Sequence, residues 1–139
     1  MKKMSGTEKD IEAMLKTLNG YLESLDHIEV MYSEKRGYII LRWDALSGRY
    51  YGIDAIGDAD QLAAYIYGEL IERITEETGS DHNLKYMDFD EPELEKARAV
   101  TGDFLNILPE EMKERLFKKM DPKTGLLRYS GMSARSLLG

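Results

Sequence analysis

The chain has 139 residues, a formal net charge of −7 at pH 7, and 42% hydrophobic beside 32% charged residues, a balance typical of a globular protein. It contains no cysteine, which excludes disulfides, thiolate catalysis and cysteine-based zinc or iron–sulfur sites. No apolar stretch approaches the roughly 20 residues that span a bilayer, and none of signal-peptide length follows the N-terminal lysines, so we expect a soluble, cytoplasmic protein with no membrane partner.

The first predicted element is a helix from about Glu8 to Leu25. Thr7, followed three residues later by Asp10, resembles a capping box with the shorter acid in place of Glu. Apolar residues at three- and four-residue steps form one stripe along this helix. The stripe consists of Ile11, Met14, Leu15, Leu18, Leu22 and Leu25.

Alternation with a period of two residues then predicts three strands, over residues 28–33, 38–46 and 49–56. The short links at residues 34–37 and 47–48 predict an antiparallel meander. One sheet face is expected to pack on the two flanking helices. That face carries Ile39, Leu41, Trp43, Tyr51 and Ile53.

The C-terminal half is predicted to be helical. Asp58, followed by Gln61, repeats the capping-box spacing at the start of a second helix, and Gly79 suits its end. After a polar loop, a third helix begins near Asp90 and a fourth follows Pro109.

Together these elements predict an α+β fold in a single domain over residues 1–139. Residues 7–79 form its core, which is a helix, a three-stranded antiparallel meander and a second helix (αβββα). Residues 90–120 form a helical pair, and residues 121–139 form a turn and a short tail.

The element order of this core resembles that of the double-stranded RNA-binding domain, which holds phosphates with lysines at the start of its second helix. Here the second helix opens with Asp58 and Asp60, and the segment from Glu69 to Glu95 contains ten acidic residues and two basic ones. Phosphate binding depends on cationic side chains. A nucleic acid is therefore an unfavourable partner.

The length, acidity and helix-then-sheet order are also similar to those of small acidic secretion chaperones. That resemblance implies a dimer that wraps an unfolded segment of a client protein. Such chaperones carry more strand after their second helix than residues 80–89 provide.

The sequence offers few candidate residues for catalysis or metal binding. Asp54, Asp58 and Asp60 offer hard oxygen ligands for magnesium or calcium, but they lack the glycine and distal glutamate of a calcium loop, and Asp58 is also explained as an N-cap. His27 and His82 are the only histidines, and no nucleophile motif accompanies them. We expect no catalytic residue, metal or cofactor.

The second sheet face is the candidate binding surface, because tyrosine and arginine are enriched at contact hot spots. Its polar and aromatic members are Glu29, Tyr38, Arg42, Asp44, Tyr50 and Asp54, and Met31 and Ile40 are predicted to lie beside them. Alternatively, the third and fourth helices cover this face, within one chain or in a homodimer.

These features predict a non-catalytic module or adaptor that binds another protein. Two alternatives stay open. One is an acidic inhibitor that mimics nucleic acid and occupies the groove of a DNA- or RNA-binding enzyme. The other is a small metal-dependent hydrolase that uses Asp54, Asp58 and Asp60.

Overall fold

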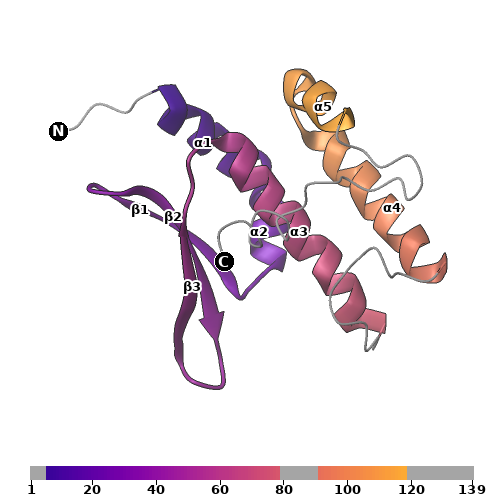
Figure 1. Ribbon diagram of the computed structural model, residues 1–139, viewed down its shortest axis with the longest axis horizontal. Helices are drawn as coiled ribbons and strands as arrows, with labels where there is room; N and C mark the ends of the chain where they lie inside the picture. Colours follow the sequence, from indigo (N-terminus) through magenta and orange to yellow (C-terminus); the bar gives the residue numbers. More distant parts are fainter. Residues whose placement is uncertain (1–5, 79–90, 119–139) are drawn as a thin grey trace. The chain divides into compact units, whose positions relative to one another are not determined.

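The computed structural model of the chain describes residues 6–78 and 91–118. The fold is α+β, with a helix, a three-stranded antiparallel sheet and then further helices, as predicted (Figure 1). The elements are α1 (Gly6–Thr17), α2 (Asn19–Ser24), β1 (Ile28–Ser33), β2 (Gly37–Asp44), β3 (Arg49–Ala55), α3 (Ala59–Thr78), α4 (Glu91–Ile107) and α5 (Glu110–Phe117).

The chain forms two compact units, residues 1–63 and residues 64–139, and α3 runs from the first into the second. The expectation of one domain over residues 1–139 stays a prediction. The predicted loop over residues 80–90 and the predicted turn and tail over residues 121–139 lie outside the described residues.

The prediction of one continuous helix from Glu8 to Leu25 was wrong, because α1 ends at Thr17 and α2 begins at Asn19. Two local features account for the interruption. The Thr17 hydroxyl donates to the carbonyl of Ala13 (3.0 Å), a bond that bends helices. Asn19 and Gly20 then follow, and both have low helix propensity. The apolar stripe nevertheless persists, with Ile11, Met14, Leu18 and Leu25 buried.

The register between β1 and β2 defines the covered face of the sheet, because directly opposed residues point to the same side. The opposed pairs on this side are Ile28 with Arg42, Val30 with Ile40 and Tyr32 with Tyr38. Tyr38, Ile40 and Arg42 are all buried. The covered face is therefore the one predicted to lie away from the first two helices.

Helix α1 packs on this covered face. It contacts β2, and Tyr32 and Tyr38 lie beside its carboxylates. The two rings meet edge to face with centroids 5.0 Å apart. A hydrogen bond with Glu8 raises the pKa of Tyr32. For Tyr38, burial and then the neighbouring Glu12 carboxylate raise the pKa to about 12.

The β3 strand contains a bulge at Gly52. Ile40 lies opposite Asp54 while Arg42 lies opposite Tyr51, so β3 has one residue more than β2 between these pairs. Gly52 has a φ of +62°, in the left-handed region that favours glycine. Because of the extra residue, even-numbered side chains of β3 point to one side of the sheet before Gly52 and to the other side after it.

The start of α3 contains one of the two hydrogen bonds of the predicted capping box. The Asp58 carboxylate accepts a hydrogen bond from the Gln61 backbone N–H (2.8 Å), and the Gln61 side chain accepts one from the Gly57 N–H (2.6 Å). The first bond satisfies a donor that a helix start leaves unpaired, whereas the donor of the second bond, Gly57, precedes the Asp58 cap. Asp58 therefore has a structural role at this position.

In the second unit, α3 and α4 pack through a buried polar and aromatic contact. The Tyr67 ring lies 5.4 Å from that of Phe104, and its hydroxyl lies 2.8 Å from Oγ1 of Thr101. Thr101 in turn donates to the carbonyl of Ala97 (2.7 Å). Among residues 6–78 and 91–118, every helix is too short or too polar to span a bilayer.

Candidate functional site

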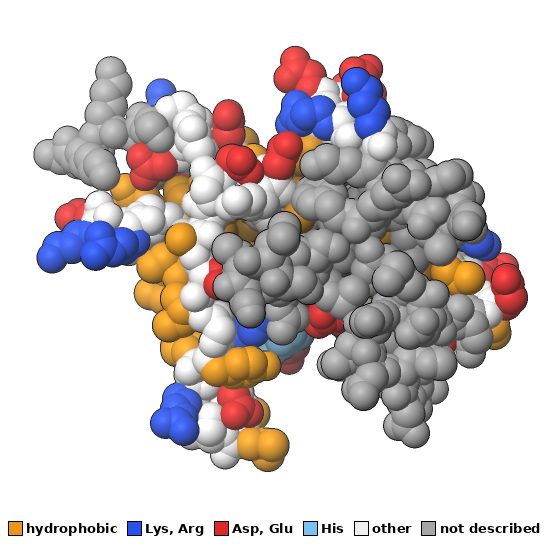
Figure 2. Space-filling view, in the orientation of Figure 1, with side chains coloured by type: hydrophobic (Ala, Val, Ile, Leu, Met, Phe, Trp, Pro, Cys, Tyr) orange, Lys and Arg blue, Asp and Glu red, His pale blue; other side chains and the backbone are white. Residues whose placement is uncertain are grey.

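The uncovered side of the sheet exposes large apolar side chains. We call this side the strand face, and its members are Glu29, Met31, Ile39, Leu41, Trp43, Tyr50 and Ile53. Met31 is 53% exposed, Trp43 40%, Tyr50 41% and Ile53 60%. Figure 2 shows hydrophobic side chains gathered over the sheet, on the left of the view.

The exposed apolar area of the strand face is comparable to that of the largest apolar patch on a typical monomeric protein. Four large side chains exposed to this degree present on the order of 300 Å² of mostly apolar surface. Leu41 is buried between them in the middle strand, and Ile39 is half-buried. Contiguous patches of this size on folded proteins often serve as contact sites.

Trp43, Tyr50 and Glu29 form an ordered group on the strand face. The two rings meet edge to face, with centroids 5.0 Å apart and planes at 70°, a favourable arrangement for aromatic pairs. The Tyr50 hydroxyl donates a hydrogen bond to the Glu29 carboxylate. That bond is the main cause of the raised pKa of Tyr50. The bond also links the outer strands β1 and β3 across β2.

The turn between β2 and β3 continues the apolar surface. Leu46 at its tip is 98% exposed. The turn is ordered by Asp44, whose carboxylate accepts a hydrogen bond from the Leu46 N–H (3.1 Å) and whose carbonyl accepts one from Gly48 (2.8 Å). Asp44, predicted as a binding residue, therefore shapes the turn.

Of the six predicted binding residues, the structure brings only Glu29 and Tyr50 together on the exposed side. Tyr38 and Arg42 are buried on the covered face, and Asp54 shares that face, opposite Ile40. The predicted common face was wrong for two physical reasons. Glu29 lies opposite Leu41, which points to the other side of the sheet from Arg42. The extra residue at the bulge places Tyr50 and Asp54 on opposite sides of the sheet.

Met31 was correctly grouped with Glu29, but Trp43 and Ile53 were assigned to the core and missed as surface residues. The sequence of β1 contains the pattern that identifies Trp43 and Ile53 as surface residues. There, Ile28 and Val30 alternate with Glu29, so the apolar side of β1 marks the covered face. Antiparallel pairing then places Trp43 on the opposite side.

The aspartates of the hydrolase alternative do not form a ligand group. Within the described ranges, no three His, Asp or Glu side chains are arranged to hold a metal ion. Asp58 is exposed and caps α3, while Asp54 is half-buried on the sheet. The geometry therefore gives this alternative no support.

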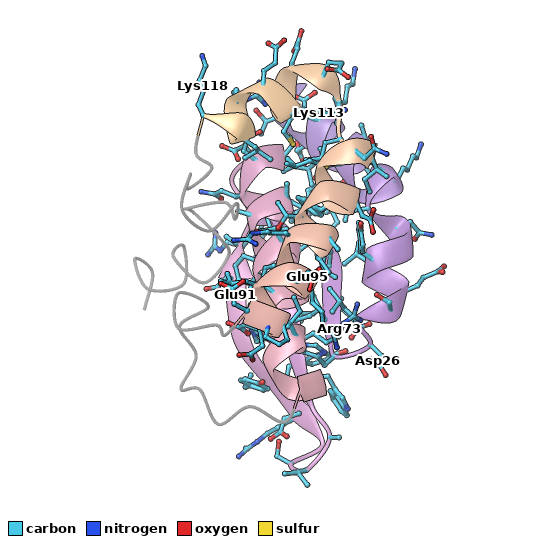
Figure 3. All side chains as sticks on the ribbon, turned by 90° about the vertical axis from the view of Figure 1, so that its right-hand side faces the viewer. Asp26, Arg73, Glu91, Glu95, Lys113 and Lys118 are labelled. Carbon is cyan, nitrogen blue, oxygen red and sulfur yellow. The ribbon has the colours of Figure 1, made fainter. Side chains whose placement is uncertain are left out.

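The acids of the second unit are divided between surface and interior. Glu91 and Glu95 lie exposed on α4 (Figure 3), whereas Glu69 of α3 and Glu93 of α4 are buried. On α5, Glu110 is bonded to Lys113 (3.3 Å). A nucleic-acid mimic needs carboxylates spaced along one exposed ridge, and the buried pair cannot contribute to it.

Comparison with known proteins yields no match to a family model, to a curated protein or to a solved structure. The strand face is thus the feature from which a function can be argued.

Proposed function

We propose that the protein is a non-catalytic module of the cytoplasm that binds another protein through the strand face. The observation that carries this proposal is the joint exposure of Met31, Trp43, Tyr50 and Ile53 on one side of the sheet, whereas on the other side Tyr38, Ile40 and Arg42 are buried. Isolated apolar side chains on a surface need no explanation, but a contiguous group of them does.

The composition of the strand face supports protein binding. Trp and Tyr are the residues most enriched at contact hot spots, and here a tryptophan lies edge to face with a tyrosine. The hydrogen bond from Tyr50 to Glu29 restrains the tyrosine side chain before any partner arrives. A restrained side chain loses less conformational entropy on binding.

The area indicates the strength of such a contact. Burial of about 300 Å² of apolar surface contributes on the order of 7 kcal/mol before association costs. Lost translational and rotational freedom offsets much of that gain, while burial on the partner adds to it. We expect a transient complex with an affinity in the micromolar range.

Affinity capture with two matched variants tests the proposal. Ile53→Glu places a charge on the strand face, whereas Ile107→Glu places the same charge at a similarly exposed apolar position of α4, where Ile107 is 44% exposed. Each tagged protein is expressed in its native cells, and bound proteins are quantified by mass spectrometry. A protein captured by the wild type and by Ile107→Glu, but lost with Ile53→Glu, is the expected result. Equal capture by all three would contradict the proposal.

A further inference from the structure

We propose that the occupant of the strand face is an amphipathic helix of another protein, which places a basic side chain against Glu29. This inference rests on the proposed function, since it names the kind of partner that the strand face accepts.

The dimensions of the strand face match a single helix. Its strands have six, eight and seven residues, so the face is about 20 to 26 Å long. The outer strands of a three-stranded sheet lie about 10 Å apart. An α-helix is about 10 Å wide, and 14 residues of it extend about 21 Å. One helix of about four turns therefore covers the exposed side chains from β1 to β3.

A second copy of the chain is a poorer occupant. Two strand faces packed together would place two Glu29 carboxylates in one apolar contact, with no basic side chain of the strand face to pair them. Each copy also carries a net charge of −7, so like charge opposes their association. A helix from a neutral or basic protein avoids that repulsion.

Addition of a partner strand at the edge of the sheet is also a poorer solution. Such pairing uses the backbone groups of an edge strand. It would leave the exposed side chains of Trp43 and Ile53 on the adjacent face in contact with water. An occupant that lies across the face removes both from water.

The charge of the strand face specifies one feature of the helix. Glu29 is its sole charged member, and it lies on the edge strand β1. Its carboxylate accepts the hydrogen bond from Tyr50, and a carboxylate has capacity for further donors. A lysine or arginine at the flank of the apolar stripe would donate to Glu29 while the stripe covers Trp43 and Ile53.

Titration with synthetic peptides of defined pattern tests this inference, and Trp43 serves as the reporter because the chain has one tryptophan. The first probe is a 14-residue peptide of Leu and Lys with leucines at helical spacing. The second has the same composition in scrambled order, the third has Glu in place of Lys, and the fourth alternates Leu and Lys as a strand. Binding is followed by Trp43 emission and mapped by amide chemical shifts.

The helical Leu–Lys peptide is expected to shift Trp43 emission to the blue and to perturb β1, β2 and β3. The scrambled peptide, which has the same charge, should bind at least tenfold more weakly. Glu29→Gln should weaken binding of the helical peptide about two- to fivefold and should not weaken binding of the Glu-containing peptide, because it removes a like charge. Ile53→Glu should weaken binding about tenfold or more, and Ile107→Glu should not.

Other outcomes would overturn the inference. Equal binding of the helical and scrambled peptides would mean that charge alone attracts them. Preference for the alternating peptide, with shifts confined to one edge strand, would indicate strand addition. Emission that shifts with protein concentration alone would indicate a second copy, and a shift with neutral lipid vesicles would indicate a membrane surface. If Ile53-dependent capture of a protein succeeds while every peptide fails, the helix is wrong and the proposed function stands.

Discussion

Substitution of Gly52 by alanine tests the bulge that divides the two sheet faces. Gly52 has a φ of +62°, and a Cβ there would lie 3.1 Å from Cδ of the buried Arg42. The left-handed backbone costs a residue with a side chain about 1 kcal/mol or more. Carbon atoms normally approach to about 3.5 to 4.0 Å, so Arg42 must also move by a few tenths of an ångström. Displacing a packed side chain from its rotamer adds about 0.5 to 1.5 kcal/mol.

Gly48→Ala is the matched control, because Gly48 has a similar φ of +67° and nothing within 4 Å of the added Cβ. Alanine also restricts the unfolded chain by a similar amount at both sites. We therefore expect Gly52→Ala to lower the free energy of unfolding by about 2 kcal/mol and Gly48→Ala by about 1 kcal/mol. Urea unfolding followed by Trp43 fluorescence reports on the sheet itself. Equal losses at the two positions, or no loss at Gly52, would refute the account of the bulge.

Three further predictions concern other contacts. Tyr67→Phe and Thr101→Val should each lower the free energy of unfolding by about 1 kcal/mol, and together by less than their sum, because they share one hydrogen bond; an additive double variant would exclude that coupling. The pKa of Tyr38, about 12 in the fold and about 10 when unfolded, predicts stability that is complete below pH 10 and falls as the pH rises through 12. Relative to Tyr38→Phe, the wild type should lose about 1 to 2 kcal/mol over that interval, and parallel profiles of the two proteins would contradict this. Asp58→Ala should cost about 1 kcal/mol through loss of the α3 cap, whereas Asp58→Asn should retain most of the stability; equal effects on thermal unfolding would show that the cap bond contributes nothing.

Local sequence signals predicted the order of the elements and several of their ends. The capping pair Asp58 and Gln61 marks the start of α3 because the bonds that form it lie within four residues. Pro109 likewise precedes α5. Such signals need no knowledge of the rest of the fold.

The covered sheet face could not be predicted from β2 alone, because both of its sides carry large apolar residues. Ile40 and Leu41 are adjacent in sequence and both are buried, yet they point to opposite sides. The choice between them depends on the pairing with β1 and on the packing of α1, which join residues distant in sequence. Gly52 within a strand pattern was the available sign of a bulge.

The candidate site was predicted only in part, because the side on which each residue lies also depends on the strand pairing. Glu29 and Tyr50 were placed on one face, and the structure joins them by a hydrogen bond. Their role in binding stays a prediction. Trp43 was assigned to the core because it alternates with the apolar Ile39 and Leu41, whereas the register places it on the side away from Arg42 and its side chain is 40% exposed.

Site-specific photo-crosslinking tests most directly whether the strand face is the contact surface. A photoreactive phenylalanine derivative is placed at Met31, on the strand face, or at Ile107, a control position of similar exposure on α4, and the cells are irradiated. A crosslinked partner at Met31, absent at Ile107 and suppressed by Ile53→Glu, is the predicted result. A partner crosslinked equally at both positions, or at Ile107 alone, would contradict the assignment of the strand face as the binding surface.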